Sequence, residues 1–132
     1  MYVLTKEGNI EYVAAAPGLV PAEMEKLFKD IRLLLHAQLT TQEVFYFAAM
    51  LHLVFVKIHP FEDRNWRMGR LLEKWFLANK LGANAWFLAS ERYYYEHHAT
   101  YYNNIRKLGL EYNELNYEAA APFLLMLPAS LQ

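Results

Sequence analysis

The spacing of apolar residues along the chain predicts a mainly α-helical fold. Over 21–36, apolar side chains recur at intervals of three and four residues, which is the period of an amphipathic helix. The set comprises Met24, Leu27, Phe28, Ile31, Leu34 and Leu35. Pro21 suits the first position of that helix. The next segment, 41–57, is apolar on nearly every face, so it is expected at the centre of a helical bundle. Thr40 and Glu43 have the spacing of a capping box at its start.

Three further helices are predicted after position 64. The first covers 65–79, with Leu71, Leu72, Trp75 and Phe76 as its core face and Gly82 just past its end. The second covers 91–107, with Ser90 as its N-terminal cap. The last is short, within 118–127, and is expected to stop at Pro128.

The N-terminal segment has a different pattern, that of a β-hairpin. Residues 2–5 and 10–13 are β-prone and flank the turn-forming residues Lys6, Glu7, Gly8 and Asn9. A two-stranded hairpin is marginally stable in water by itself. It is therefore expected to pack against the bundle or to pair with another strand.

Composition narrows the class of protein. The 132 residues include no cysteine, are 55% hydrophobic and carry a net charge of −1. This excludes a disordered chain and a disulfide framework, and it predicts a single domain over 1–132. The near-zero charge argues against nucleic acid as a partner. The longest apolar run, 44–56, is shorter than the about 20 residues of a membrane span. With no apolar leader in 1–13, the expected location is cytoplasmic, without a membrane partner.

The residues that indicate chemistry lie in 58–70, where a loop leads into a helix. Free backbone N–H groups and the helix dipole attract anions at such a point. Arg67 and Arg70 are three residues apart, hence on one helical face, and two guanidiniums there suit a polyphosphate. Asp63 can cap the helix or hold Mg²⁺, and His59 titrates near neutral pH. Each residue also has an ordinary structural explanation; their coincidence within twelve positions favours a phosphate site.

This segment resembles the signature of the Fic family, H-P-F-x-[DE]-G-N-G-R-x-x-R. Seven of its nine specified positions match: His59, Pro60, Phe61, Asp63, Asn65, Arg67 and Arg70. The hairpin, the amphipathic helix and the apolar helix also precede the motif in the family's order. The resemblance implies a mainly α, compact Fic-type bundle with a short N-terminal hairpin, 2–13, acting as a flap over the signature loop at 59–70.

The resemblance also implies an activity. Fic domains usually transfer AMP from Mg-ATP to a Tyr, Thr or Ser hydroxyl of a target protein. By this likeness His59 is the general base, Asp63 holds Mg²⁺, and Asn65 with nearby backbone N–H groups lines the anion hole. Arg67 and Arg70 hold the phosphates, and Phe61 anchors the loop in the core.

Two positions depart from the signature, because Arg64 and Trp66 replace its glycines. Glycine permits positive φ and close approach of a ligand, which a side chain can block. Arg64 could instead add a phosphate contact, and Trp66 could point outward or form a wall of the nucleotide pocket. Three activities stay open: AMP transfer, a degenerate domain that binds nucleotide or protein as a regulatory module, and Doc-like phosphotransfer.

The sequence says less about regulation and partners than about the activity. The family's inhibitory pattern, [ST]-x-x-x-E-[GN], is absent, because no Ser or Thr has Glu four residues later. Inhibition is then lacking, supplied by a partner in trans, or encoded outside this chain. The flap could register the target by strand pairing, pair within the fold, or pair with a second copy in a homodimer. His52, on the apolar helix, is expected to be a satisfied core residue.

Overall fold

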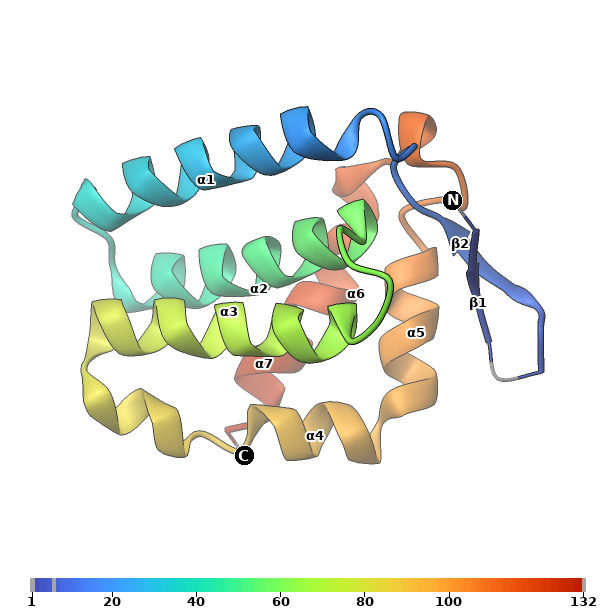
Figure 1. The fold of residues 1–132 in the computed structure, drawn as a ribbon. Helices are drawn as coiled ribbons and strands as arrows, with labels where there is room; N and C mark the ends of the chain where they lie inside the picture. The colour runs from blue at the N-terminus through green and yellow to red at the C-terminus, as the bar shows by residue number, and fades with distance from the viewer. Residues whose placement is uncertain (1, 6, 132) are drawn as a thin grey trace.

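The computed structural model describes residues 2–5 and 7–131 and is mainly α-helical, with a small hairpin at its N-terminal end (Figure 1). The elements are β1 (Tyr2–Leu4), β2 (Ile10–Val13), α1 (Val20–His36), α2 (Thr41–Ile58), α3 (Asn65–Leu81), α4 (Ser90–Glu96), α5 (His98–Arg106), α6 (Ala121–Leu124) and α7 (Met126–Ala129), with 3₁₀ turns η1 (Ala83–Phe87), η2 (Tyr112–Glu114) and η3 (Tyr117–Ala120). The predicted helical bundle with an N-terminal hairpin is confirmed. Lys6, in the predicted turn, lies outside the described residues.

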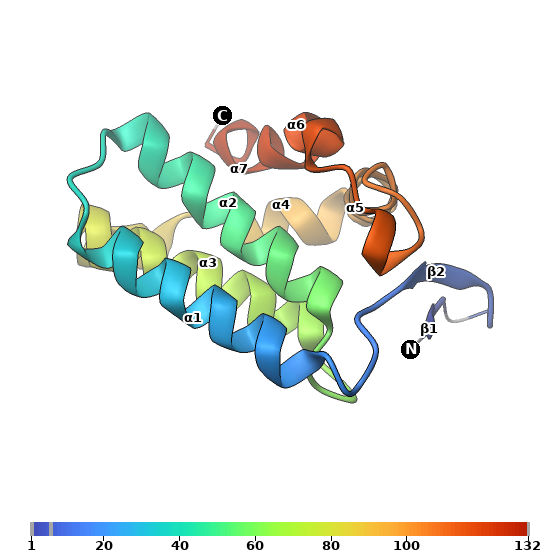
Figure 2. The ribbon, with the colours of Figure 1, turned by 90° about the horizontal axis from the view of Figure 1, so that it is seen from above.

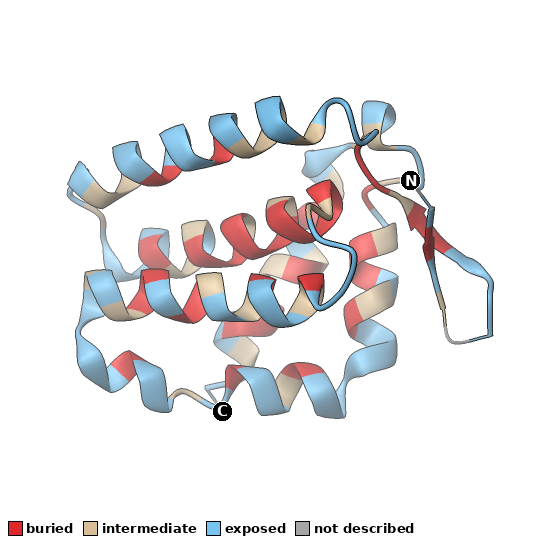
Figure 3. Cartoon of the chain, in the orientation of Figure 1, coloured by how far each residue is buried: buried red, intermediate tan, exposed pale blue. Residues whose placement is uncertain are grey.

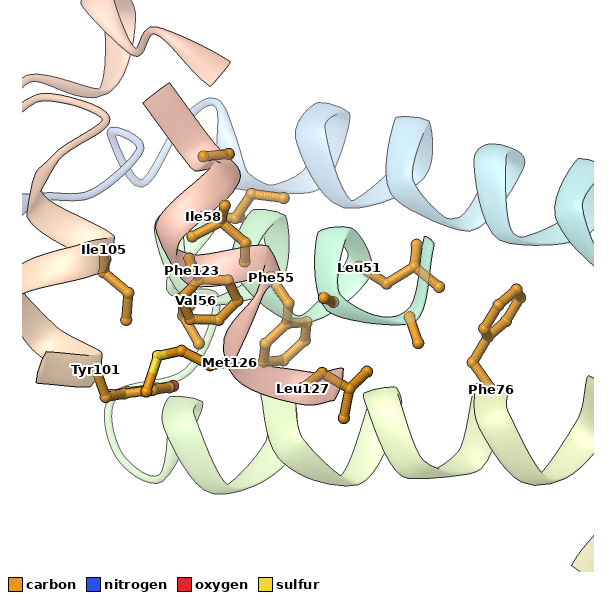
Figure 4. Close-up of a cluster of buried hydrophobic side chains, with 14 of the residues drawn as sticks. Leu51, Phe55, Val56, Ile58, Phe76, Tyr101, Ile105, Phe123, Met126 and Leu127 are labelled. Carbon is orange, nitrogen blue, oxygen red and sulfur yellow. The ribbon is translucent and has the colours of Figure 1, made fainter. Parts of the chain in front are cut away.

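Helix α2 forms the centre of the bundle. It runs between α1 and α3 on one side and α6 and α7 on the other (Figure 2). Its start is fixed by the predicted capping box: the Thr40 hydroxyl accepts from the Glu43 N–H, and the Glu43 carboxylate accepts from the Thr40 N–H. Core side chains from α2, α3, α5, α6 and α7 meet around it, among them Phe55, Val56, Phe76, Phe123 and Leu127 (Figure 4).

Within the described residues, α2 is also the one helix long and apolar enough to cross a membrane by length and composition. In this structure 56% of it is buried. A core helix enclosed by its own bundle has the same composition, so this feature is weak evidence for a membrane span.

The hairpin packs within the fold. Val3 pairs with Tyr12 across the two antiparallel strands. Tyr12 is fully buried, and its hydroxyl donates a 2.7 Å hydrogen bond to the Val56 carbonyl at the end of α2. The Val13 N–H donates to the Leu110 carbonyl. These contacts fix β2 beside the C-terminal ends of α2 and α5, next to the signature loop.

The C-terminal third differs from the predicted helices. The expected helix over 91–107 breaks at His97, whose φ of −115° and ψ of 35° leave the helical region between α4 and α5. Ser90 begins α4 without capping it, and its hydroxyl is buried without a partner in the described chain. The expected helix within 118–127 is η3, α6 and α7. Pro128 lies inside α7, in a first turn that needs no N–H from it.

Helix α3 ends before Gly82 as predicted, and its core face is confirmed in part: Phe76 is buried and Leu72 is partly buried against the core. The other two predicted core residues are exposed. Leu71 is 47% exposed and Trp75 38% exposed. The buried side is formed by Asn65, Gly69, Glu73, Lys74, Phe76 and Leu77 (Figure 3). Gly69 explains the rotation, because a Cβ there would lie 2.8 Å from His52 Cδ2 and 2.9 Å from Val56 Cγ1. The absence of that Cβ lets α3 approach α2 along this face.

Candidate active site at the start of α3

The loop between α2 and α3 contains two left-handed residues. His59 has φ 55° and ψ 61°, and Arg64 has φ 64° and ψ 24°. They are the non-glycine residues with positive φ in the described chain. Such conformations cost L-residues of the order of 1–2 kcal/mol and persist where surrounding contacts impose them. Arg64 therefore occupies a glycine position of the signature and keeps a backbone shape that glycine favours.

The side chain of Asn65 holds this loop closed. Its Nδ2 donates to the Phe61 carbonyl at 2.7 Å, and its Oδ1 accepts from the Phe61 N–H at 3.0 Å. The residue is 1% exposed. Both ends of the amide thus bind one backbone unit, and the loop takes a fixed course into α3.

Phe61 has a smaller role than expected. Its ring centroid lies 6.2 Å from that of Phe55, but the residue is 50% exposed, so it is not an anchor inside the core. The Asn65 amide already fixes the loop backbone, and the ring covers the end of α2 from outside.

His59 lies half-buried between aromatic side chains. Its ring centroid is 6.4 Å from that of Tyr12 on β2 and 5.9 Å from that of Trp66, both in edge-to-face geometry. Its Nδ1 is buried and has no hydrogen-bond partner among the described residues. Burial lowers the pKa of His59 below its usual 6.5. The imidazole is therefore neutral at neutral pH and can accept a proton.

Trp66 points inward in the first turn of α3. Its ring contacts His59 and, at 5.2 Å between centroids, Tyr102 of α5. Its indole Nε1 is buried without a hydrogen-bond partner in the described chain. A groove of about 820 Å³ extends from Trp66 between the hairpin and α4–α5, with Glu11 and Arg106 on its walls. Of the two orientations left open by the sequence, the structure shows the inward one, with Trp66 lining this groove.

The charged residues of the signature face solvent to different degrees. The side chain of Asp63 is 88% exposed and that of Arg64 68%, with 3.9 Å between their Oδ2 and Nε atoms. Asp63 does not cap α3: its Oδ1 accepts from the Arg64 N–H at 2.7 Å. Arg67 is exposed, whereas Arg70 is partly buried. Burial raises the pKa of Tyr102, and the positive charge of Arg70 partly opposes that rise.

Asp63 is the residue that suits a magnesium ion. No group of three or more metal-ligating side chains occurs within residues 2–5 and 7–131. Mg²⁺ commonly uses one or two carboxylates and takes its other ligands from water and substrate phosphates. One accessible hard carboxylate beside arginines fits that donor set.

A buried polar network beneath the loop was only partly anticipated. His52 is fully buried, with Nδ1 3.2 Å from Glu73 Oε1 and Nε2 2.7 Å from the Tyr101 hydroxyl. Tyr94 donates to Glu73 Oε1 at 2.8 Å. The prediction of a satisfied core histidine is confirmed. Glu73 was missed, although its spacing of four from Gly69 places it on the same helical face.

The chain was compared with known families, curated proteins and solved structures. Residues 2–77, which run from β1 into α3, match the model of the Fic/DOC family. This match covers more than half of the chain. It contains the hairpin, the signature loop, and Arg67 and Arg70 at the start of α3. No curated protein and no solved structure matches.

Proposed function

Because this chain belongs to the Fic/DOC family, we propose that it transfers AMP from Mg-ATP to a Tyr, Thr or Ser hydroxyl of a target protein. The observation that carries the proposal is the pairing of a neutral, half-buried His59 with a helix that begins six residues later and has no side-chain cap. The first provides a base, and the second provides N–H groups for an anion.

The chemistry follows from these positions. The His59 imidazole takes the proton of the target hydroxyl as its oxygen attacks the α-phosphorus. A new P–O bond forms to the hydroxyl oxygen, the bond from the α-phosphorus to the bridging oxygen breaks, and pyrophosphate leaves. Arg67, Arg70 and the N-terminus of α3 stabilise the phosphate charge. Asp63 would hold the Mg²⁺ that neutralises charge on the phosphates.

Trp66 favours a second candidate, a nucleotide- or protein-binding regulatory module. Its ring lies directly against His59, where the signature has a glycine. A ligand that must approach His59 closely meets this indole. A domain that keeps the loop and the arginines but admits no reacting phosphate would bind without turnover.

Calorimetric titration of Mg-ATP into the purified chain, with Arg70→Ala as control, tests the proposal. We expect binding that the control loses, followed by a mass increase of one AMP on candidate target proteins. An added mass of one phosphate would identify a Doc-like phosphotransferase instead. Binding without any transfer would favour the regulatory module. His59→Ala should abolish transfer while nucleotide binding survives.

A double variant, Arg64→Gly with Trp66→Gly, separates an obstructed site from an absent one. If the indole obstructs the nucleotide, the double variant binds Mg-ATP more tightly than the natural chain. Unchanged or weaker affinity would count against obstruction by Trp66.

A further inference from the structure

The solvent-facing side of α3 is apolar, unlike an ordinary surface helix. Met68, Leu71 and Trp75 are 37%, 47% and 38% exposed, and Ala78 is partly exposed. We refer to these four residues as the α3 seam. Exposed segments recur along α3 in Figure 3. Both residues that the sequence pattern wrongly placed in the core, Leu71 and Trp75, belong to this seam.

Helix α1 provides the internal comparison. Its solvent side carries the charged residues Glu25, Lys26, Lys29, Asp30 and Arg32. Of its exposed apolar residues, Phe28 lies among these charges, and Leu33 borders an apolar groove shared with α2. The α3 seam contains no charged residue.

The spacing of the α3 seam is that of a helix–helix contact. Its members lie three, four and three residues apart, which is the a/d pattern of paired helices. The opposite side of α3 is already packed against α2 through Gly69, Glu73 and Phe76. A second apolar stripe at this spacing is the kind of surface that a second helix covers.

We propose that two copies of this chain associate through their α3 seams, antiparallel and about a two-fold axis near residue 73. Such a contact uses the same surface on both subunits, so it must be self-complementary. The seam meets that condition: Leu71 lies opposite the partner's Trp75, and Met68 lies opposite the partner's Ala78. In both pairs a larger side chain meets a smaller one.

Charge is compatible with this arrangement. Arg67 flanks the seam at one end and Asn79 at the other. In the antiparallel pair the two Arg67 residues lie at opposite ends, about 18 Å apart along the axis at 1.5 Å per residue. That separation exceeds the Debye length of about 8 Å at physiological salt. The chain's net charge of −1 adds little repulsion between copies.

The neighbouring turn η1 exposes further aromatic surface beside α3. It packs against α3 and exposes Trp86 by 46% and Phe87 by 86%. Aromatic side chains present about 150–250 Å² each when free, so Trp75, Trp86 and Phe87 expose roughly 350 Å² together. This is nearly half of the about 800 Å² that each partner of a standard interface buries.

Sedimentation velocity over a concentration series tests the proposal on the full chain. We expect a reversible species of twice the 15.5 kDa chain mass. Leu71→Lys with Trp75→Lys should weaken its association at least about tenfold. The matched control is Leu33→Lys with Tyr46→Lys, which alters an apolar groove of about 310 Å³ between α1 and α2 and should leave the dimer unchanged.

Disulfide formation between introduced cysteines provides a second test, in which the variants report the contact without having to disrupt it. The chain has no cysteine, so any disulfide reports an introduced contact. Under mild oxidation, Leu71→Cys mixed with Trp75→Cys should form more covalent dimer than either variant alone or Leu33→Cys. A monomer at every concentration, or a dimer abolished by the α1–α2 groove variant, would overturn the proposal. Neither readout depends on nucleotide transfer.

Discussion

Two histidines seven residues apart, His52 and His59, lie in opposite environments near the contact between α2 and α3. Both ring nitrogens of His52 have partners, and its neighbours Glu73, Tyr94 and Tyr101 are buried with it. His59 follows the last residue of α2 in a left-handed conformation, and its Nδ1 has no partner among the described residues. One histidine is fully hydrogen-bonded inside the fold, and the other keeps an unpartnered ring nitrogen beside Trp66.

The difference arises from where each residue stands relative to Gly69. At that glycine α3 comes close enough to enclose His52 against α2. Beyond it the helices are joined by a loop, in which Asp63 and Arg64 face solvent while the His59 Nδ1 is buried without a partner among the described residues. The same two helices therefore supply a satisfied polar network at one point and an unsatisfied histidine at another. Four predictions test this contrast, in order of decreasing effect.

Glu73→Ala should cause the largest loss. It removes the acceptor for both His52 and Tyr94 and leaves two buried polar groups unpaired. We expect unfolding free energy to fall by about 3–5 kcal/mol, measured by urea denaturation. Glu62→Ala, on the exposed loop, is the control and should change little. A loss below about 1 kcal/mol for Glu73→Ala would show that the network does not stabilise the bundle.

Gly69→Ala should have the next largest effect. Its new Cβ would overlap the His52 ring and the Val56 side chain, so α3 must move away from α2. We expect a loss of about 1–3 kcal/mol in the same assay. Gly18→Ala is the matched control, because a Cβ at that position meets nothing within 4 Å. Equal effects at the two glycines would contradict the close approach of the helices.

Arg64→Gly should stabilise the chain slightly. Glycine relieves the left-handed backbone at φ 64°, and the side chain it removes is 68% exposed. After the greater flexibility of unfolded glycine is subtracted, a gain of about 0.5–1 kcal/mol is expected. Arg67→Gly, inside α3, should instead lose up to about 1 kcal/mol. Thermal unfolding of the two variants, measured side by side, should show changes in stability of opposite sign if Arg64 has the left-handed conformation.

The protonation of His59 should produce the smallest effect. An NMR titration should give a midpoint below the usual 6.5, because burial disfavours the charged ring. Trp66→Ala exposes the ring and should raise that midpoint. In the unfolded chain His59 takes up its proton at higher pH, so its contribution to stability is present above pH 6.5 and declines as pH falls below that value. A midpoint unmoved by Trp66→Ala would mean that the indole does not cover His59.

At the candidate site, the sequence predicted the residue types but not all of their contacts. The motif identified His59, Asp63, Asn65 and both arginines, because each position carries its own residue type. It predicted that glycine's freedom matters at position 64, where φ is indeed positive. It did not reveal that Asn65 binds the backbone of Phe61 with both ends of its amide. That contact depends on how the loop folds back, which residue identity does not specify.

The sequence by itself determined the family, the central apolar helix, the capping box at Thr40 and the hairpin, because these follow from residues close together in the chain. Only the tertiary structure decided which side of α3 is buried. Leu71 and Trp75 match the helical period as well as Phe76 and Leu77 do, and local periodicity cannot rank one stripe above another. The close approach at Gly69 resolved the choice, because it is a contact between residues of two helices.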